Sequence, residues 1–339
     1  MATGLQRIRA ALADERLDHV PICPILHIMG AHMLGQPIGR YATDAAFMAE
    51  CVLHAYRTFH YDGLQLSLGV ATEAEAMGCK TFQPEDGLPI VISPVLQEPT
   101  DLAHLRLPDV RRDGRLPLFA EAISLLRDEV GSEAWIVAMI RGPLLMASQL
   151  RGVENILIDT IDRLAWVQDL LELTTAVGIR FGRLLIEAGA HAIAIGEATC
   201  SPDFISPAFY RQNVCPHHQK LVAGLHEAGC EATVMHICGQ AQPIVADVTG
   251  TGSDVMDIDY QVDPVEALAS AGTRMTVRGN IDPVNVLLFG TPQAVEQHVD
   301  AIMSRLGGRG RFILGSGCDV PPDTPVANIE ALVRAGRRY

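Results

Sequence analysis

The sequence has no excess of positive charge and no long apolar run. Among its 339 residues, 26 are Lys or Arg and 40 are Asp or Glu, which gives a formal net charge of −14. Such a chain does not attract nucleic acid or anionic membranes, so a small molecule or another protein is the expected partner. No stretch approaches the roughly 18 apolar residues of a membrane span, and no charged, then apolar leader opens the chain. We therefore expect a cytoplasmic protein without a membrane segment.

The chain also lacks the features of a disulfide framework. In a reducing cytoplasm its eight Cys residues are expected to be thiols or metal ligands. Cys51 and Cys230 lie in helical patterns, which indicates packing. Only Cys238 and Cys318 lie in glycine-rich contexts at apparent strand ends.

Short β-branched runs alternate with longer amphipathic stretches along the whole chain, without a linker or a low-complexity segment. The predicted strands are residues 22–27, 63–67, 135–140, 191–195, 233–237, 255–258, 275–278 and 312–314. The predicted helices include residues 44–59, 117–130, 162–188, 207–228, 264–271, 292–306 and 325–335. This alternation favours parallel pairing, and about eight strands predict a single α/β domain, residues 1–339, folded as a (β/α)₈ TIM barrel. Residues 78–94 are the least regular and are expected to form a hairpin or a loop over the barrel mouth.

Several helix starts combine a capping residue with a following proline. Ser206, Asp263, Thr291 and Thr324 each precede a proline, which predicts an N-cap followed by the first helical residue.

In a TIM barrel the active site forms at the carboxyl ends of the strands. That rule selects a set of polar residues from the predicted strand ends: His27, Arg141, Glu197, His236, Cys238, Asp257, Asp259, Asn280, Asp282, Cys318 and Asp319.

The most informative of these are His236, Cys238 and Cys318. Side chains two apart in a strand point the same way, so His236 and Cys238 can converge on one ion, with Cys318 arriving from a distant strand end. Two thiolates and one imidazole suit Zn²⁺, and three protein ligands leave a fourth position open for chemistry. Because two thiolates cancel the charge of the ion, such a site suits binding a further thiolate. The alternative is accidental spacing, since free Cys is common in protein cores and His often forms hydrogen bonds with nearby groups of the chain.

Three acidic residues on the same rim are candidates for catalysis. Glu197 could supply a fourth ligand or move a proton, or it could cap the following loop. Asp259 and Asp282 follow strands, where carboxylates act directly in chemistry or orient loops and helix N-termini.

Three further residues are assigned to cofactor binding. His27 and Asn280 lie on the rim, and Met29 suits the wall of a pocket for a large flat ligand. A packing role is the alternative for both His27 and Met29.

Several motifs resemble the uroporphyrinogen decarboxylase superfamily over nearly the whole chain, most strongly from Ile195 onward. They are Ser206-Pro207-x-x-Tyr210, Val214-Cys215-Pro216-His217-His218, His236-Ile237-Cys238-Gly239, Gly279-Asn280-Ile281-Asp282-Pro283, Leu288-Phe289-Gly290-Thr291-Pro292, and Gly317-Cys318-Asp319-Val320-Pro321-Pro322-Asp323-Thr324-Pro325-x-x-Asn328. This resemblance implies a single (β/α)₈ barrel.

Two branches of that superfamily differ in their expected residues. The decarboxylases hold a many-carboxylate porphyrinogen with arginines near the first strand, where residues 27–32 of this chain contain none. The cobalamin-dependent methyltransferases related to methylcobalamin:coenzyme M methyltransferase carry His-x-Cys and a late Gly-Cys as zinc ligands. This chain resembles that branch at His236, Cys238 and Cys318.

The resemblance implies a zinc-dependent methyltransferase. Zinc would hold a small substrate while a separate corrinoid protein, the carrier of the cobalamin, docks above it. The substrate is either a thiol that accepts the methyl group or a methyl donor such as an aryl methyl ether, which would undergo O-demethylation, or a methylamine; tetrahydrofolate is another acceptor. No Asp-x-His-x-x-Gly corrinoid segment and no phosphate-binding glycine loop after a strand occur in the chain, so the corrinoid comes from another polypeptide or from free cobalamin.

Several questions stay open at this level. The competing functions are a metal-free, uroporphyrinogen decarboxylase-like lyase and a zinc-stabilised binding barrel without activity. The direction of transfer, the identity of the methyl donor or acceptor, the fourth zinc ligand and the oligomeric state, including a homodimer, are not decided by the sequence.

Overall fold

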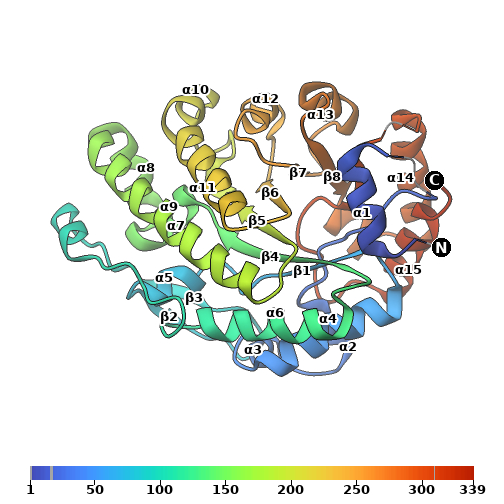
Figure 1. The fold of residues 1–339 in the computed structure, drawn as a ribbon, viewed down its shortest axis with the longest axis horizontal. Helices are drawn as coiled ribbons and strands as arrows, with labels where there is room; N and C mark the ends of the chain where they lie inside the picture. The colour runs from blue at the N-terminus through green and yellow to red at the C-terminus, as the bar shows by residue number, and fades with distance from the viewer. Residues whose placement is uncertain (1, 16–17, 309) are drawn as a thin grey trace.

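A curled sheet of seven parallel strands forms the centre of the computed structural model, which describes residues 2–15, 18–308 and 310–339 (Figure 1). The strand order is β1-β4-β5-β6-β7-β8-β9, so each strand pairs with the next one of the sheet along the chain. The strands are β1 (Gly63–Leu66), β4 (Trp135–Arg141), β5 (Ala192–Gly196), β6 (Ala232–Ile237), β7 (Val255–Ile258), β8 (Thr276–Ile281) and β9 (Phe312–Ser316).

Helices follow the strands and cover the outer face of the sheet (Figure 1). The α-helices are α1 (Gly4–Ala13), α2 (Met29–Met33), α3 (Ile38–Tyr41), α4 (Ala45–Phe59), α5 (Thr72–Ala76), α6 (Leu116–Val130), α7 (Pro143–Arg151), α8 (Val153–Asp162), α9 (Leu164–Glu187), α10 (Pro207–Phe209), α11 (Cys215–Glu227), α12 (Val245–Thr249), α13 (Pro264–Ala271), α14 (Pro292–Leu306) and α15 (Val326–Gly336). Short 3₁₀ or π-helical turns are η1 (Pro99–His104), η2 (Ala198–Cys200), η3 (Tyr210–Val214), η4 (Gln242–Ile244) and η5 (Pro283–Leu288).

The prediction that residues 22–27 form a full strand is wrong. The start of this segment nevertheless lies between β9 and β1, where the predicted strand would be. The Cys23 N–H donates to the Leu314 carbonyl at 2.7 Å, and the Asp62 N–H donates to the Ile22 carbonyl at 2.7 Å. This short segment therefore joins β9 to β1. Pro24 has no N–H to continue the pairing toward β1, so the ladder ends there. The predicted α/β barrel class is confirmed, with a bridging segment in place of an eighth strand.

Strand alternation separates the core into two layers. Trp135, Val137 and Met139 point into the barrel together with alternate residues of the neighbouring strands, while Ile136 and Ile140 face the helices. Helix α1 packs against the inner layer and against the amino-terminal part of the sheet. The carboxyl ends of the strands are therefore the end of the barrel where functional side chains gather.

Most predicted helix starts agree with the structure. The side chains of Ser206, Asp263 and Thr291 accept the expected capping hydrogen bonds. The prediction for Thr324 is wrong, because α15 begins at Val326 and Pro325 takes the capping position. The predicted helix 207–228 is interrupted by the π-helical turn η3. That turn ends just before Pro216, which has no N–H to donate to a regular α-helical turn.

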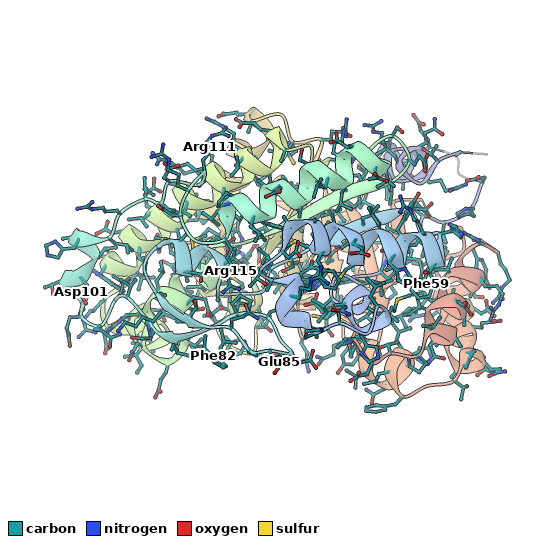
Figure 2. The ribbon with its side chains drawn as sticks, turned by 90° about the horizontal axis from the view of Figure 1, so that it is seen from below. Phe59, Phe82, Glu85, Asp101, Arg111 and Arg115 are labelled. Carbon is teal, nitrogen blue, oxygen red and sulfur yellow. The ribbon has the colours of Figure 1, made fainter. Side chains whose placement is uncertain are left out.

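Residues 78–94 contain an antiparallel hairpin of β2 (Lys80–Phe82) and β3 (Ile90–Ser93). Its tip contacts α3, because the Gly39 N–H donates to the Glu85 carbonyl at 2.8 Å. Figure 2 shows Phe82 and Glu85 at the margin of the molecule. The side chain of Arg115 donates to Gln83 and ties the hairpin to the start of α6.

Candidate metal centre

Three potential metal ligands meet at the carboxyl ends of β6 and β9. His236 lies near the end of β6, Cys238 follows that strand, and Cys318 follows β9. The Nε2 atom of His236 is 3.1 Å from the Cys238 Sγ and 3.7 Å from the Cys318 Sγ, and the two sulfur atoms are 3.5 Å apart. His236 is buried, whereas both cysteines are partly exposed.

These spacings suit a tetrahedral ion. With Zn–S bonds of about 2.3 Å and Zn–N bonds of about 2.0 Å, the edges of a tetrahedron are about 3.8 Å between sulfurs and about 3.6 Å between nitrogen and sulfur. Each observed distance lies within about 0.5 Å of the corresponding edge. The donor set and its geometry therefore fit zinc with three protein ligands.

A buried carboxylate orients the imidazole. The Nδ1 atom of His236 lies 3.3 Å from an oxygen of Asp257, so a proton on Nδ1 leaves Nε2 free to face the sulfurs. Burial opposes the charged imidazole, but the hydrogen bonds to Asp257 and Cys318 outweigh it and raise the pKa of His236 to about 10. The hydrogen bond with Cys238 and burial together raise the pKa of the Cys318 thiol. Binding a metal at these residues must therefore release protons.

Asp257 is itself held by Arg278 on the next strand. Two guanidinium nitrogens of Arg278 lie 2.5 Å from the two carboxylate oxygens, and the same side chain donates to Gln65 and Cys23. Burial alone would raise the pKa of Asp257, but the charge of Arg278 and the contact with His236 lower it. Sequence reasoning placed Asp257 on the rim and missed Arg278. The available signal was a charged residue at the end of the predicted strand 275–278, where the strand-end rule selects polar residues.

Glu197 does not lie at the His236, Cys238 and Cys318 group. In β5 the inward positions are Ala192, Ala194 and Gly196, so Glu197 faces the helices. Its carboxylate oxygens accept the N–H groups of Leu144 and Leu145 at 2.9 and 3.0 Å, at the start of α7.

Glu197 belongs to a second, fully buried polar group behind the sheet. It lies 3.0 Å from Nε2 of His218 and 3.5 Å from the Cys200 Sγ, and the other nitrogen of His218 lies 3.1 Å from the Tyr210 hydroxyl. The alternative expected from the sequence, a cap on the following loop, differs from what is found: the carboxylate caps α7 and contacts only the Cys200 side chain of η2. A chemical role for Glu197 stays a prediction.

The two other acidic candidates also have structural contacts. Asp259 accepts the N–H groups of Gly239 and Gln261 at 3.0 and 3.1 Å, and so fixes the loop after Cys238. One oxygen of Asp282 accepts the first N–H groups of η5 at 2.8 and 2.9 Å. Direct catalytic roles for both carboxylates stay predictions.

The three residues assigned to a cofactor are placed differently from one another. Met29 is fully buried in the outer core. Asn280 lies inside β8 and donates to the carbonyls of Asp259 and Val262. His27 is buried, with Nε2 3.2 Å from Asp319, which follows β9.

The fold and the site define a class: an α/β barrel with a histidine and two cysteines converging at the carboxyl ends of its strands. A family model described as "Uroporphyrinogen decarboxylase (URO-D)" matches residues 3–339. The chain therefore belongs to the uroporphyrinogen decarboxylase family.

Individual members of that family are similar to this chain over most of its length. It is 28% identical to the methylcobamide:CoM methyltransferase MtaA of Methanosarcina barkeri, over 98% of this chain and 97% of the relative. A uroporphyrinogen decarboxylase of a Synechococcus species is 27% identical over 85% of this chain and 81% of the relative. A solved structure described as a methyltransferase from Methanosarcina mazei has a TM-score of 0.91 and 28% identity, covering 100% of this chain and 99% of that one. The chain is thus homologous to corrinoid-dependent methyltransferases over its full length.

The described residues contain no helix that is both long and apolar enough to cross a membrane.

Proposed function

We propose that this protein is a zinc-dependent methyltransferase that moves a methyl group between a corrinoid and a small substrate held at His236, Cys238 and Cys318. The observation that carries the proposal is the convergence of one imidazole nitrogen and two thiols at the mouth of a barrel homologous to methyltransferases. In this proposal residues 1–339 act as one catalytic domain in the cytoplasm.

The residues of the chain have defined tasks in this proposal. Zinc at this donor set would bind a substrate thiol as thiolate and lower its pKa while leaving it nucleophilic. His236 supplies Nε2 because Asp257 engages Nδ1, and the loop held by Asp259 positions Cys238.

A thiol is the preferred substrate because two thiolate ligands make the centre close to neutral. The names of the methyltransferase relatives specify coenzyme M, which makes that thiol the first to test here. A methyl donor such as an aryl methyl ether, with O-demethylation as the reaction, and a folate acceptor are the alternatives.

A corrinoid protein is the proposed partner, and exposed aromatic residues in the segments that follow three strands support it. Phe204, Tyr260 and Phe289 follow β5, β7 and β8, with exposed fractions of 53%, 46% and 76%. Exposed aromatic side chains in three of the segments that lead from a strand to the next helix suit the face of a flat macrocycle presented by another polypeptide.

The first experiment is zinc analysis of protein purified without a chelator, in the wild type, His236→Ala and Cys318→Ala. We expect about one zinc per chain in the wild type and a loss in both variants. Cys230→Ala is the matched control, because Cys230 precedes the opposite end of β6 and should leave the zinc content unchanged.

The second measurement is methyl transfer by the same proteins, from methylcobalamin to a panel of thiols and from methyl ethers to cob(I)alamin. Activity that disappears with the zinc supports the proposal, and the active pair of substrates gives the direction. A folded wild type that takes up no zinc and decarboxylates a porphyrinogen would instead identify a lyase. Zinc with corrinoid-protein binding but no transfer would identify a binding barrel.

A further inference from the structure

A pocket of about 420 Å³ lies between the segment 107–111 and the last two turns of α9. Because α9 leads back to the start of β5, this part of the helix lies toward the amino ends of the strands, at the other end of the barrel from the metal centre. The pocket has an apolar part and a charged part, formed by Leu107, Pro108, Val110 and Leu184 and by Asp109, Arg111, Arg180, Arg183 and Glu187.

The two carboxylates of the pocket are already engaged. Glu187 forms an ion pair with Arg111, which reaches it from the opposite wall. Asp109 accepts the backbone N–H of Arg111 at 3.1 Å and lies 3.7 Å from the side chain of Arg112. Figure 2 shows Arg111 at the margin of the molecule, so this wall of the pocket faces the solvent. Neither carboxylate therefore neutralises the arginines of α9 by direct contact.

Arg180 and Arg183 carry the unbalanced charge of the pocket. Both are exposed, and among the described residues no carboxylate oxygen lies within 4.0 Å of either guanidinium group. Residues three apart on a helix are neighbours, with about 5–6 Å between their Cβ atoms, and like charges at such a spacing destabilise the helix. In a chain with a net charge of −14, two adjacent cations without a partner form a local site that favours an anion.

The charge and the size of the pocket indicate the chemical class of that anion. Two guanidinium groups on one face of a helix can hold one phosphate between them, since each matches the phosphate oxygens with paired hydrogen bonds. Their two charges equal those of a phosphate ester dianion. The volume lies within the roughly 300–1,000 Å³ of small-molecule pockets.

The apolar wall provides a place for the rest of the ligand. Leu184 is buried at the base of the pocket, and Leu107 is 36% exposed beside it. An organic group that covers Leu107 and Val110 would remove apolar surface from water. A ligand with both a phosphate and an apolar or aromatic part uses both sides of the pocket.

We propose that Arg180 and Arg183 bind the phosphate group of a small phosphate ester whose organic part lies on Leu107, Val110 and Leu184. The site is separate from the metal centre, so this inference stands independently of the proposed function. It assigns to the outside of the barrel a second ligand, distinct from the substrate at the mouth.

Titration calorimetry in a buffer without phosphate tests the assignment. Inorganic phosphate, phenyl phosphate and neutral benzyl alcohol are the probes. Phenyl phosphate should bind the wild type about 3- to 10-fold more tightly than inorganic phosphate, because its ring covers the apolar wall. Benzyl alcohol has no anionic group and should not bind measurably. A wild type that binds neither phosphate would overturn the assignment.

Variants of the two arginines locate the phosphate. Arg180→Met and Arg183→Met should each weaken the binding of phenyl phosphate by at least about 5-fold, and Arg180→Lys should retain part of the affinity. Both arginines are exposed, so the variants should fold, which thermal unfolding checks. Arg274→Met is the matched control for the change in net charge, because Arg274 is exposed in the turn between α13 and β8. It should bind as the wild type does.

The metal centre is the other place where a phosphate could bind. Cys318→Ala lacks one of the proposed zinc ligands and should bind phenyl phosphate with wild-type affinity, whether or not the wild type contains zinc. A loss of binding in Cys318→Ala would place the phosphate at the mouth and overturn the assignment. Equal affinities in Arg180→Met, Arg183→Met and Arg274→Met would also overturn it, because the attraction would then be nonspecific.

Discussion

Asp257 lies directly behind His236, with 3.3 Å between its carboxylate oxygen and the Nδ1 atom that faces away from the two cysteines. The two residues are in register on neighbouring strands, so the sheet itself sets their contact. A carboxylate in this position fixes the tautomer of a ligating imidazole and makes it a stronger ligand.

The first prediction concerns this contact. Asp257→Asn should weaken zinc binding by about 10- to 100-fold, because the amide holds the imidazole less well and does not support its basicity. Competition with a chromophoric chelator measures the dissociation constant. Asp254→Asn is the matched control, since Asp254 precedes the other end of β7. Equal zinc affinity in the wild type and Asp257→Asn would refute the orienting role.

The second prediction contrasts two buried arginines. Arg278→Met leaves Asp257 buried without its cation and should lower the free energy of unfolding by about 3–5 kcal/mol. Arg141→Met removes a charge that contacts the Ser67 hydroxyl and makes no direct ion pair with any described residue, and should change the free energy of unfolding by less than about 1 kcal/mol. Urea unfolding of both variants measures the difference. Losses of similar size would mean that Arg141 stabilises the fold as much as the ion pair of Arg278 does.

The third prediction concerns Glu197. Glu197→Ala leaves the buried N–H groups of Leu144 and Leu145 without an acceptor, which should cost about 2–4 kcal/mol of stability. Zinc content and thiol affinity of the folded fraction should stay at wild-type values. If instead thiol affinity falls while stability is unchanged, Glu197 acts at the metal centre as the catalytic hypothesis requires.

The barrel and the ligand group could be predicted because both depend on short patterns. Alternating apolar and amphipathic segments are local, and the spacing of His236 and Cys238 fixes a shared direction once β6 is a strand. The first strand failed because Pro24 removes a donor where pairing to β1 would continue, an effect that depends on the neighbouring strand.

The residues around the ligand group were harder to predict from the sequence. Arg278 and Asp257 lie on neighbouring strands, and the sequence of neither strand determines the register in which the two strands pair. Glu197 was placed correctly at a strand end, but the face on which it lies follows from the alternation of β5. Applying that alternation to Ala194 and Gly196 would have turned Glu197 toward the helices.

The last prediction concerns pH and a histidine far from the metal centre. His191 is buried just before β5, where its Nδ1 accepts the N–H of Ile136 at 3.0 Å beside the side chain of Arg127. Burial lowers the pKa of His191 to about 4; the charge of Glu231 opposes this shift and the charge of Arg127 adds to it. The unfolded chain has an ordinary histidine pKa of about 6.5, so between these values the unfolded state binds more protons and stability rises with pH. The contribution of His191 is complete above pH 6.5 and is lost as the pH falls toward 4. The full loss is about 3 kcal/mol.

Urea unfolding from pH 4.5 to 7.5, with a chelator present so that metal binding does not contribute, should give a steeper pH dependence for the wild type than for His191→Gln. His298→Gln, an exposed change on α14, should match the wild type. Parallel curves for the wild type and His191→Gln would show that His191 titrates alike in the folded and unfolded chain.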